Sequence, residues 1–330
     1  MLGTLGLIVT LALALLALPL AADAQEHRPG NPARIGRLSP LSAETDAPNL
    51  AGIRKGLREL GWVEGRHFVL ESRFANGHLD RLPALAAELV ERRVDVIITG
   101  STPGARAAKR ATRSIPIVMV TTGDPVAGGL VASLARPGGN VTGVTALGQA
   151  LNMKRLELIK EAVPGVTRVA VLTNPLSPYT PPFLKAREGA ARALGLALPV
   201  LEAREPGHLE KAFAAVGPER ASALMVLADV MFITHRQRIV ELAARTRVPA
   251  VYGEREFVDA GGLMFYGASL ADMYGDAAGY VDRILKGARP ADLPVGQPTR
   301  LELVINLKTA NTLGLALPSS VLARADRLVQ

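Results

Sequence analysis

The sequence repeats one local pattern, in which a small polar residue directly precedes proline near the end of an apolar run. The pattern recurs at Ser39-Pro40, Thr102-Pro103, Asp124-Pro125 and Asn174-Pro175. A small polar side chain before proline is typical of a helix start, because the side chain caps free amide groups and proline fits the first helical turn. Such amide groups bind anions, whereas a carboxylate such as that of Asp124 favours a cation or a hydrogen-bond donor.

Polar residues with complementary chemistry lie at equivalent places in the two halves of the chain. Ser101 and Thr102 offer hydroxyl and amide donors in the first half, and Asp229 and Glu254 offer carboxylates in the second. A zwitterion fits this set, with its carboxylate at the first pair and its ammonium at the second pair or at Asp124. The predicted ligand-binding residues are Ser39, Ser101, Thr102, Asp124, Asn174, Asp229, Glu254 and Tyr266, and Tyr252 and Tyr266 are the candidates to cover an apolar or aromatic side group.

Motifs for covalent or metal chemistry are absent from the sequence. Neither GxGxxG after a strand nor GxxxxGK[ST] occurs, so the common phosphate-binding loops are excluded. The 5 histidines have no HxxxH or HExxH spacing, and we expect no metal site. The segment 267–271, GASLA, lacks the second glycine of a nucleophile elbow, and no histidine follows it. We therefore expect a binding protein without a cofactor and without enzyme activity.

The elements that position these residues follow from the periodicity of apolar side chains. Runs without strict alternation, such as 94–99, suit strands covered on both faces of a parallel sheet. The first half predicts strands at 34–38, 67–74, 94–99, 117–120 and 141–145, and helices at 49–60, at 79–92 and from 104 onward. This alternation of strand and helix is typical of a doubly wound α/β domain.

The same alternation of strand and helix is predicted again in the second half of the chain. The sequence there predicts strands at 168–173, 197–201, 223–227, 250–252, 263–266 and 301–306, and helices at 151–162, 181–194, 209–216, 235–246, 270–285, 307–313 and 318–328. Pro116, Val118 and 127–130 (AGGL) recur at a constant spacing as Pro249, Val251 and 260–263 (AGGL). We therefore expect two lobes of one topology, whose strand ends face each other across a ligand-binding cleft.

Composition excludes several classes of protein. With 330 residues, of which 48% are hydrophobic and 4% aromatic, the chain suits two α/β domains. The formal net charge is +8, but the basic residues are scattered among acids and not clustered with aromatic residues, so nucleic-acid binding is not expected. The absence of cysteine excludes disulfides and thiol chemistry.

Residues 1–24 have the pattern of a signal peptide. The run from Leu5 to Leu20 is almost wholly apolar, and Ala22-Asp23-Ala24 fits the small-x-small rule for cleavage. The alternative, a membrane anchor, needs about 20 apolar residues and usually basic flanks. No cysteine follows the cleavage site, which excludes a lipid anchor there. We expect export to the periplasm.

Several segments together resemble a known family. They are 99–103 (TGSTP), 123–131 (GDPVAGGLV), 136–143 (RPGGNVTG), 257–263 (FVDAGGL) and 303–310 (LVINLKTA). They look like the ABC-transporter substrate-binding family that includes tryptophan and tyrosine uptake proteins. The resemblance implies the type I periplasmic-binding-protein fold and a small organic solute, an amino acid or related carboxylate, held between two lobes. It also implies delivery to an inner-membrane ABC permease and ATPase, and we expect a monomer.

The resemblance further implies how the chain is divided. Lobe 1 would contain residues 25–143 and 268–296, and lobe 2 residues 144–267 and 297–330, joined by a three-segment hinge that closes about Val144 and Phe265. Two alternatives remain open from the sequence. One is an exported enzyme that acts on a small carboxylate on the same scaffold. The other is a ligand-sensing regulator, which needs a DNA-binding helix pair where this chain has its apolar leader.

Overall fold

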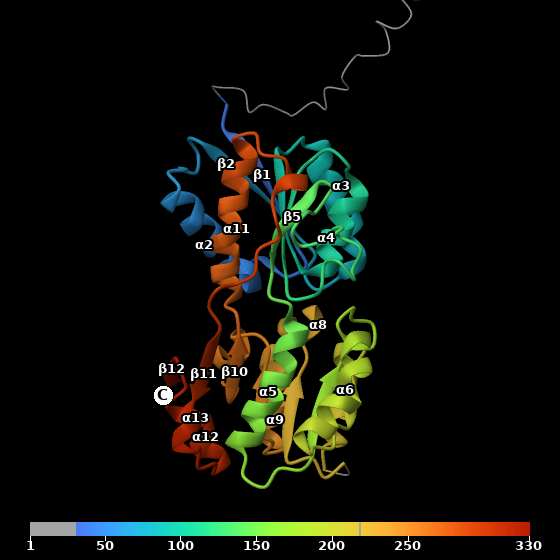
Figure 1. The fold of residues 1–330 in the computed structure, drawn as a ribbon, viewed down its shortest axis with the longest axis vertical. Coiled ribbons are helices and arrows are strands. Elements are labelled where there is room, and N and C mark those ends of the chain that lie inside the picture. Colours follow the sequence, from blue (N-terminus) through green and yellow to red (C-terminus); the bar gives the residue numbers. More distant parts are fainter. Residues whose placement is uncertain (1–30, 218) are drawn as a thin grey trace, which may run out of the picture.

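The structure is a computed structural model that describes residues 31–217 and 219–330, apart from the side chain of Gln149. The predicted signal peptide at 1–24 lies outside the described residues. Figure 1 shows two lobes stacked along the long axis of the molecule. Within the described ranges, no helix combines the length and apolar character needed to cross a bilayer.

The N-terminal lobe is a parallel sheet covered by helices on both faces. Its strands are β1 (Ala33–Ser39), β2 (Phe68–Phe74), β3 (Val96–Gly100), β4 (Ile117–Thr121) and β5 (Val141–Thr145), in the order β2-β1-β3-β4-β5. Its helices are α2 (Ala43–Glu59), α3 (Leu82–Glu91), α4 (Ser101–Ala111) and α11 (Leu270–Leu285), with a 3-10 turn at Leu79–Arg81. Helices α2 and α11 cover one face, and α3 and α4 cover the other, so β3 and β4 are buried along their whole length.

The C-terminal lobe repeats this arrangement and extends it. Its strands are β6 (Val169–Thr173), β7 (Val200–Glu202), β8 (Ala223–Val226), β9 (Ala250–Tyr252), β10 (Met264–Gly267), β11 (Glu302–Asn306) and β12 (Arg327–Val329). Its helices are α5 (Gly148–Ala162), α6 (Thr180–Leu194), α7 (Leu209–Ala214), α8 (Val230–Thr234), α9 (Arg236–Arg245), α10 (Glu256–Asp259), α12 (Leu307–Leu313) and α13 (Ser319–Leu322). Helices α5, α6, α12 and α13 pack on one face, and α7 and α9 on the other.

Strand order confirms the prediction of two lobes with one topology. The C-terminal sheet runs β12-β11-β10-β9-β8-β6-β7, so its strands β7-β6-β8-β9-β10 match β2-β1-β3-β4-β5 of the N-terminal sheet. The extension differs, because β11 is antiparallel to β10. The predicted fold class, two doubly wound α/β lobes, is confirmed. The carboxyl ends of the parallel strands in each lobe meet at the boundary between the lobes, where Figure 1 shows the lobes adjoining.

The chain passes between the lobes in three segments. The first follows β5, the second joins β10 to α11, and the third follows the 3-10 turn at Pro290–Asp292 and leads to β11. The first and third segments are tied together, because Thr145 N donates to Gly296 O and Gly296 N donates to Gly143 O, both at 2.9 Å. Position 143 requires glycine, since its φ is +133° and a Cβ there would collide with the Met119 backbone.

Several predicted elements have different bounds in the structure. Helix α2 begins at Ala43, not at Asn49, because the Ser42 hydroxyl caps it by accepting a hydrogen bond from Thr45 N at 3.2 Å. The predicted helix at 235–246 matches α9, and a short helix that the sequence does not predict, α8, precedes it.

The predicted C-terminal helix at 318–328 is wrong. Only α13 is helical there, and residues 327–329 form strand β12 beside β11. The cause is Asp326, whose carboxylate accepts a hydrogen bond from Leu303 N at 2.8 Å while its own amide donates to Leu303 O at 2.9 Å. These two bonds fix the chain in register with β11, an arrangement that helical periodicity cannot reveal.

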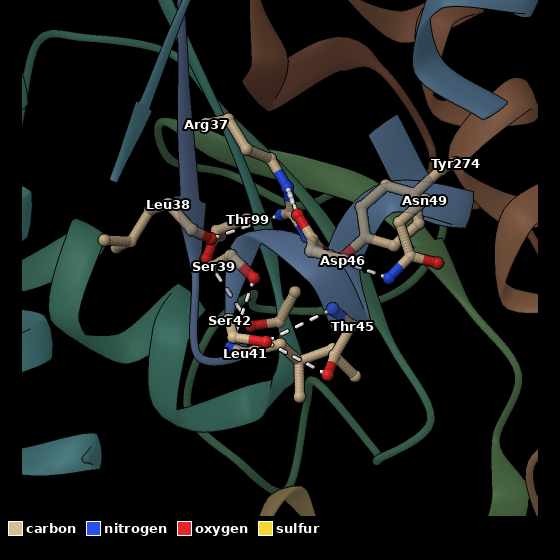
Figure 2. Close-up of polar contacts among 11 residues, drawn as sticks. Arg37, Leu38, Ser39, Leu41, Ser42, Thr45, Asp46, Asn49, Thr99 and Tyr274 are labelled. Atoms are coloured by element: carbon tan, nitrogen blue, oxygen red, sulfur yellow. Dashed lines mark hydrogen bonds and ion pairs between the residues drawn. The ribbon is translucent and has the colours of Figure 1, made fainter. Parts of the chain in front are cut away.

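A fully buried ion pair joins β1, α2 and α11 of the N-terminal lobe (Figure 2). Arg37 on β1 donates to Asp46 on α2 through Nε at 2.9 Å and Nη2 at 2.6 Å, and Nη2 also donates to Tyr274 OH on α11 at 2.8 Å. Asn49 Nδ2 donates to the same carboxylate at 2.9 Å. Although burial alone would lower it, the neighbouring Tyr274 and Asp46 raise the pKa of Arg37, so the guanidinium stays charged.

We expect Arg37→Met to lower the free energy of unfolding by about 3–5 kcal/mol, because it leaves Asp46 buried without its cation. The matched control is Arg34→Met on the same strand. The Arg34 side chain is 42% exposed in its ion pair with Glu71, so its loss should cost less than about 1 kcal/mol. Urea denaturation of both variants measures the two effects. Equal effects would contradict the assigned role of the buried pair.

Candidate functional site

Two adjacent cavities lie between the lobes at the carboxyl ends of the strands. The larger has a volume of about 270 Å³ and the smaller about 70 Å³. Thr122 from the N-terminal lobe, and Tyr179 and Ala228 from the C-terminal lobe, line both. We refer to the two cavities together as the cleft. This is the edge of the sheets where the sequence predicts ligand binding.

Tyr179 separates the two cavities and joins the lobes. Its hydroxyl accepts a hydrogen bond from Thr102 N and lies beside Thr102 Oγ1 and Thr121 Oγ1, each at 3.3 Å. Its ring lies against Gly123, where a Cβ would collide with it. A residue of the C-terminal lobe therefore accepts a hydrogen bond from a backbone amide in the first turn of helix α4, in the N-terminal lobe.

The start of helix α4 differs from the prediction. Thr102 is not the N-cap, because the helix begins at Ser101 with Gly100 as its N-cap. Ser101 has a φ of +66°, which is rare for a residue with a side chain, and its Oγ accepts a hydrogen bond from Gly104 N at 3.3 Å. This turn brings the Ser101 side chain to the smaller cavity and Thr102 to the larger one.

Arg155 on α5 is a candidate site residue that the sequence does not predict. It lines the larger cavity and is only 4% exposed. Its Nε donates to Tyr266 O and its Nη1 to Asn152 Oδ1, both at 2.8 Å. Within the described ranges, Nη2 has no hydrogen-bond partner and no carboxylate forms an ion pair with this guanidinium. Burial lowers the pKa of Arg155 to about 10, so it remains charged at neutral pH.

A signal for Arg155 is present in the sequence. Residues Leu158, Ile159 and Ala162 are buried, and Arg155 precedes them by the intervals that place residues on one face of a helix. An arginine on the apolar face of a helix needs a partner, because a buried charge without one is costly. The prediction missed this signal because it searched strand ends and not helix faces.

Glu254 lines the smaller cavity as a buried acid. It is 6% exposed, and its Oε2 has no hydrogen-bond partner among the residues that the structure describes. Burial raises its pKa to about 8, with Arg155 lowering it in part and Glu256 and Asp229 adding to the rise. Asn49 Oδ1, from the N-terminal lobe, also lines this cavity and is likewise unpartnered in the described chain. The smaller cavity therefore contains two buried side-chain oxygens, Glu254 Oε2 and Asn49 Oδ1, that have no hydrogen-bond partner in the described chain.

Comparison with known proteins identifies the family. The family model described as ABC transporter substrate binding protein matches residues 35–329. The chain belongs to this family. The resemblance seen in the sequence is confirmed, and so is the type I periplasmic-binding-protein fold.

Individual relatives cover most of this substrate-binding protein. A tyrosine-binding protein of Clostridioides difficile (strain R20291) is 26% identical over 279 residues, which is 83% of this chain and 79% of the relative. The structure of a conserved domain protein from Vibrio cholerae is 28% identical with a TM-score of 0.84, over 90% of this chain and 100% of that one. An ABC domain from Streptococcus pneumoniae in complex with L-Trp is 26% identical with a TM-score of 0.82, over 91% and 100%.

The substrate-binding protein brings five of the eight predicted ligand-binding residues to the cleft. Thr102 and Asp124 line the larger cavity, and Ser101, Asp229 and Glu254 line the smaller one. Asp124 also caps a turn, because its Oδ1 accepts from Val126 N at 2.8 Å and Ala127 N at 3.1 Å. Burial raises the pKa of Asp229.

The remaining three predicted residues line neither cavity. The Ser39 hydroxyl is fully buried and accepts a hydrogen bond from Leu41 N at 3.2 Å, so it shapes the turn after β1. Asn174 Nδ2 donates a hydrogen bond to Asp229 Oδ1 at 3.2 Å and so helps to orient the Asp229 carboxylate. Tyr266 acts through its backbone, whose carbonyl oxygen holds Arg155. Tyr252 packs with α7 and α9 and does not cover the cleft.

We expect Glu254 to make the folded substrate-binding protein less stable as the pH rises from about 4.5 to 8. Its pKa is raised from 4.5 to about 8 on folding, so the folded state binds the extra proton throughout this window. Glu254→Gln should remove this dependence, and its stability relative to the natural protein should grow with pH by on the order of a few kcal/mol.

Urea denaturation across this pH range measures the difference between the two proteins. Glu188→Gln, at an exposed position on α6, is the control and should follow the natural protein at every pH. A Glu254→Gln curve parallel to that of the natural protein would show that Glu254 does not hold its proton in the folded state.

Proposed function

We propose that this protein binds an α-amino acid or a related small carboxylate in the cleft and releases it unchanged to an inner-membrane ABC permease and its ATPase. One observation carries the proposal: the buried guanidinium of Arg155 lines the larger cavity and forms no ion pair within the described chain, and the charge of Glu254 offsets only part of the burial that lowers its pKa. A ligand carboxylate would form charge-assisted hydrogen bonds with the free Nη2 and offset the cost of burying this cation.

The other groups of the cleft suit the rest of an amino acid. Asp124 beside the larger cavity is an acceptor for an ammonium group. Glu254 in the smaller cavity, whose pKa is raised to about 8, pairs with an ammonium group only once it loses its proton. Pro178, Tyr179 and Leu227 give the larger cavity an apolar wall for a side chain. This combination of a mostly apolar wall with a few placed polar groups is typical of small-molecule sites.

The relatives support the same ligand class. One is named a tyrosine-binding protein, and another structure is a complex with L-Trp. Both are about a quarter identical to this chain, and both match it over most of its length. We therefore propose an aromatic amino acid as the first ligand to test.

We further propose that the lobes open and close about the three connecting segments. The moving bodies would be residues 25–143 with 268–296, and 144–267 with 297–330. The bonds from Tyr179 to Thr102 and Thr121 join the two bodies and would break on opening, so they contribute to the closed form only. The signal peptide at 1–24, the periplasmic location without a lipid anchor and the monomeric state belong to the same proposal.

A thermal-shift screen of amino acids and small carboxylates, followed by titration calorimetry, tests the proposal, because a ligand that binds the folded state raises the melting temperature. We expect L-tryptophan or L-tyrosine to bind. Tryptamine, which lacks the carboxylate, should bind much more weakly. Chromatography of the recovered ligand should show no conversion.

We expect Arg155→Met to weaken binding of that amino acid about 10- to 150-fold, since hydrogen bonds to charged groups contribute about 1.5–3 kcal/mol. Arg155→Lys keeps the charge but loses the paired donors of the guanidinium, so its affinity for the ligand should lie between those of the natural protein and Arg155→Met. The control is Lys154→Met, on the adjacent, half-exposed side chain that pairs with Glu157. Unchanged affinity in a folded Arg155→Met protein, or tryptamine binding as tightly as tryptophan, would refute the assignment.

A further inference from the structure

A third cavity lies in the C-terminal lobe, outside the cleft. It has a volume of about 520 Å³ and runs between α9 and α12, over strand β9 and the turn that leads into β10. Its lining is largely apolar and includes Val240, Ala243, Val248, Leu263 and Leu313. None of its lining residues lines either cavity of the cleft.

Tyr252 contributes a hydrogen-bonding group without a partner. The residue lines this cavity and is 1% exposed, and its hydroxyl bonds to no residue in the described ranges. Its ring is held in place by stacking on Phe257, with ring centres 4.6 Å apart, and by Gly262, where a Cβ would collide with it. Burial raises the pKa of Tyr252, so the phenol stays neutral and can donate. The hydroxyl is therefore free to donate to an acceptor bound in the cavity.

Asn306 supplies a second donor to the same cavity. It is 7% exposed, and its Oδ1 accepts a hydrogen bond from Thr309 N at 3.0 Å. This bond orients the amide so that the NH₂ group is left over, and that group has no partner among the described residues. Two nearly buried side chains thus offer donors to one cavity.

The charges around the cavity have one sign. Arg247 and Lys308 line it, both side chains are exposed, and neither forms an ion pair in the part of the chain that the structure describes. No aspartate or glutamate lines the cavity. An anion would meet two donors and two cations without an opposing carboxylate.

We propose that this cavity is a second ligand site, for a small organic carboxylate with an apolar body. The carboxylate takes the hydrogen bonds of Tyr252 and Asn306 under the field of Arg247 and Lys308, and the apolar body packs on α9 and α12. The proposal does not depend on the function proposed for the cleft, because the two sites share no lining residue.

Saturation-transfer NMR and calorimetry with phenylacetate test this site, with phenylacetamide as the matched neutral probe. We expect phenylacetate to bind and phenylacetamide to bind much more weakly. Tyr252→Phe keeps the stacked ring and removes only the hydroxyl, and should weaken phenylacetate binding about fivefold or more. Lys308→Gln should weaken it as well, with a reduced dependence on salt.

Arg155→Met separates this site from the cleft. Any phenylacetate bound in the cleft should be lost in that variant, whereas the binding that depends on Tyr252 should remain. The proposal is overturned if phenylacetate does not bind at millimolar concentration, if Tyr252→Phe leaves its affinity unchanged, if phenylacetamide binds equally well, or if Arg155→Met abolishes the binding.

Discussion

Two buried arginines, Arg37 and Arg155, determine much of this structure, because burying a positive charge is costly unless partners stabilise it. The two side chains are stabilised in different ways. Arg37 is fully buried and has a complete set of partners: the Asp46 carboxylate, the Tyr274 hydroxyl and a backbone carbonyl. Arg155 is nearly as buried, but its hydrogen bonds go to neutral groups, and no carboxylate of the described chain forms an ion pair with it. The first arginine stabilises a lobe, and the second leaves a requirement that an anion in the cleft can meet.

The fold explains why this requirement arises at the boundary between the lobes. Five strands of each sheet have the same order, so their carboxyl edges carry loops of the same kind, and these edges lie against each other. Arg155, on the first helix after the chain enters the C-terminal lobe, is held by the carbonyl of Tyr266 on the strand by which the chain leaves it. The cation is thus fixed beside two of the connecting segments, where a bound ligand would influence closure.

Sequence patterns predict the framework of this protein better than its site. Short, nearly continuous apolar runs predict nearly all strands within a few residues, because buried parallel strands have a strong local signal. Strand β12 and the early start of α2 were missed, since each depends on one polar side chain, Asp326 or Ser42, that takes a specific backbone partner. Pairing of that kind is set by the three-dimensional arrangement and has no periodic signature.

The same reasoning explains which predicted site residues reach the cleft. The rule that ligands bind at the carboxyl ends of strands placed Thr102, Asp124 and Glu254 correctly beside the cavities. It cannot say which polar side chain turns inward to serve its own loop, as Ser39 does, or which residue a helix contributes, as with Arg155.

A crystal structure of the protein with a bound amino acid is the most direct test of this account. We expect the ligand carboxylate within hydrogen-bond distance of the Arg155 guanidinium, in the larger cavity, with Tyr179 closing the cleft over it. A ligand bound between the lobes with its carboxylate directed away from Arg155, or a ligand bound only outside the cleft, would contradict it.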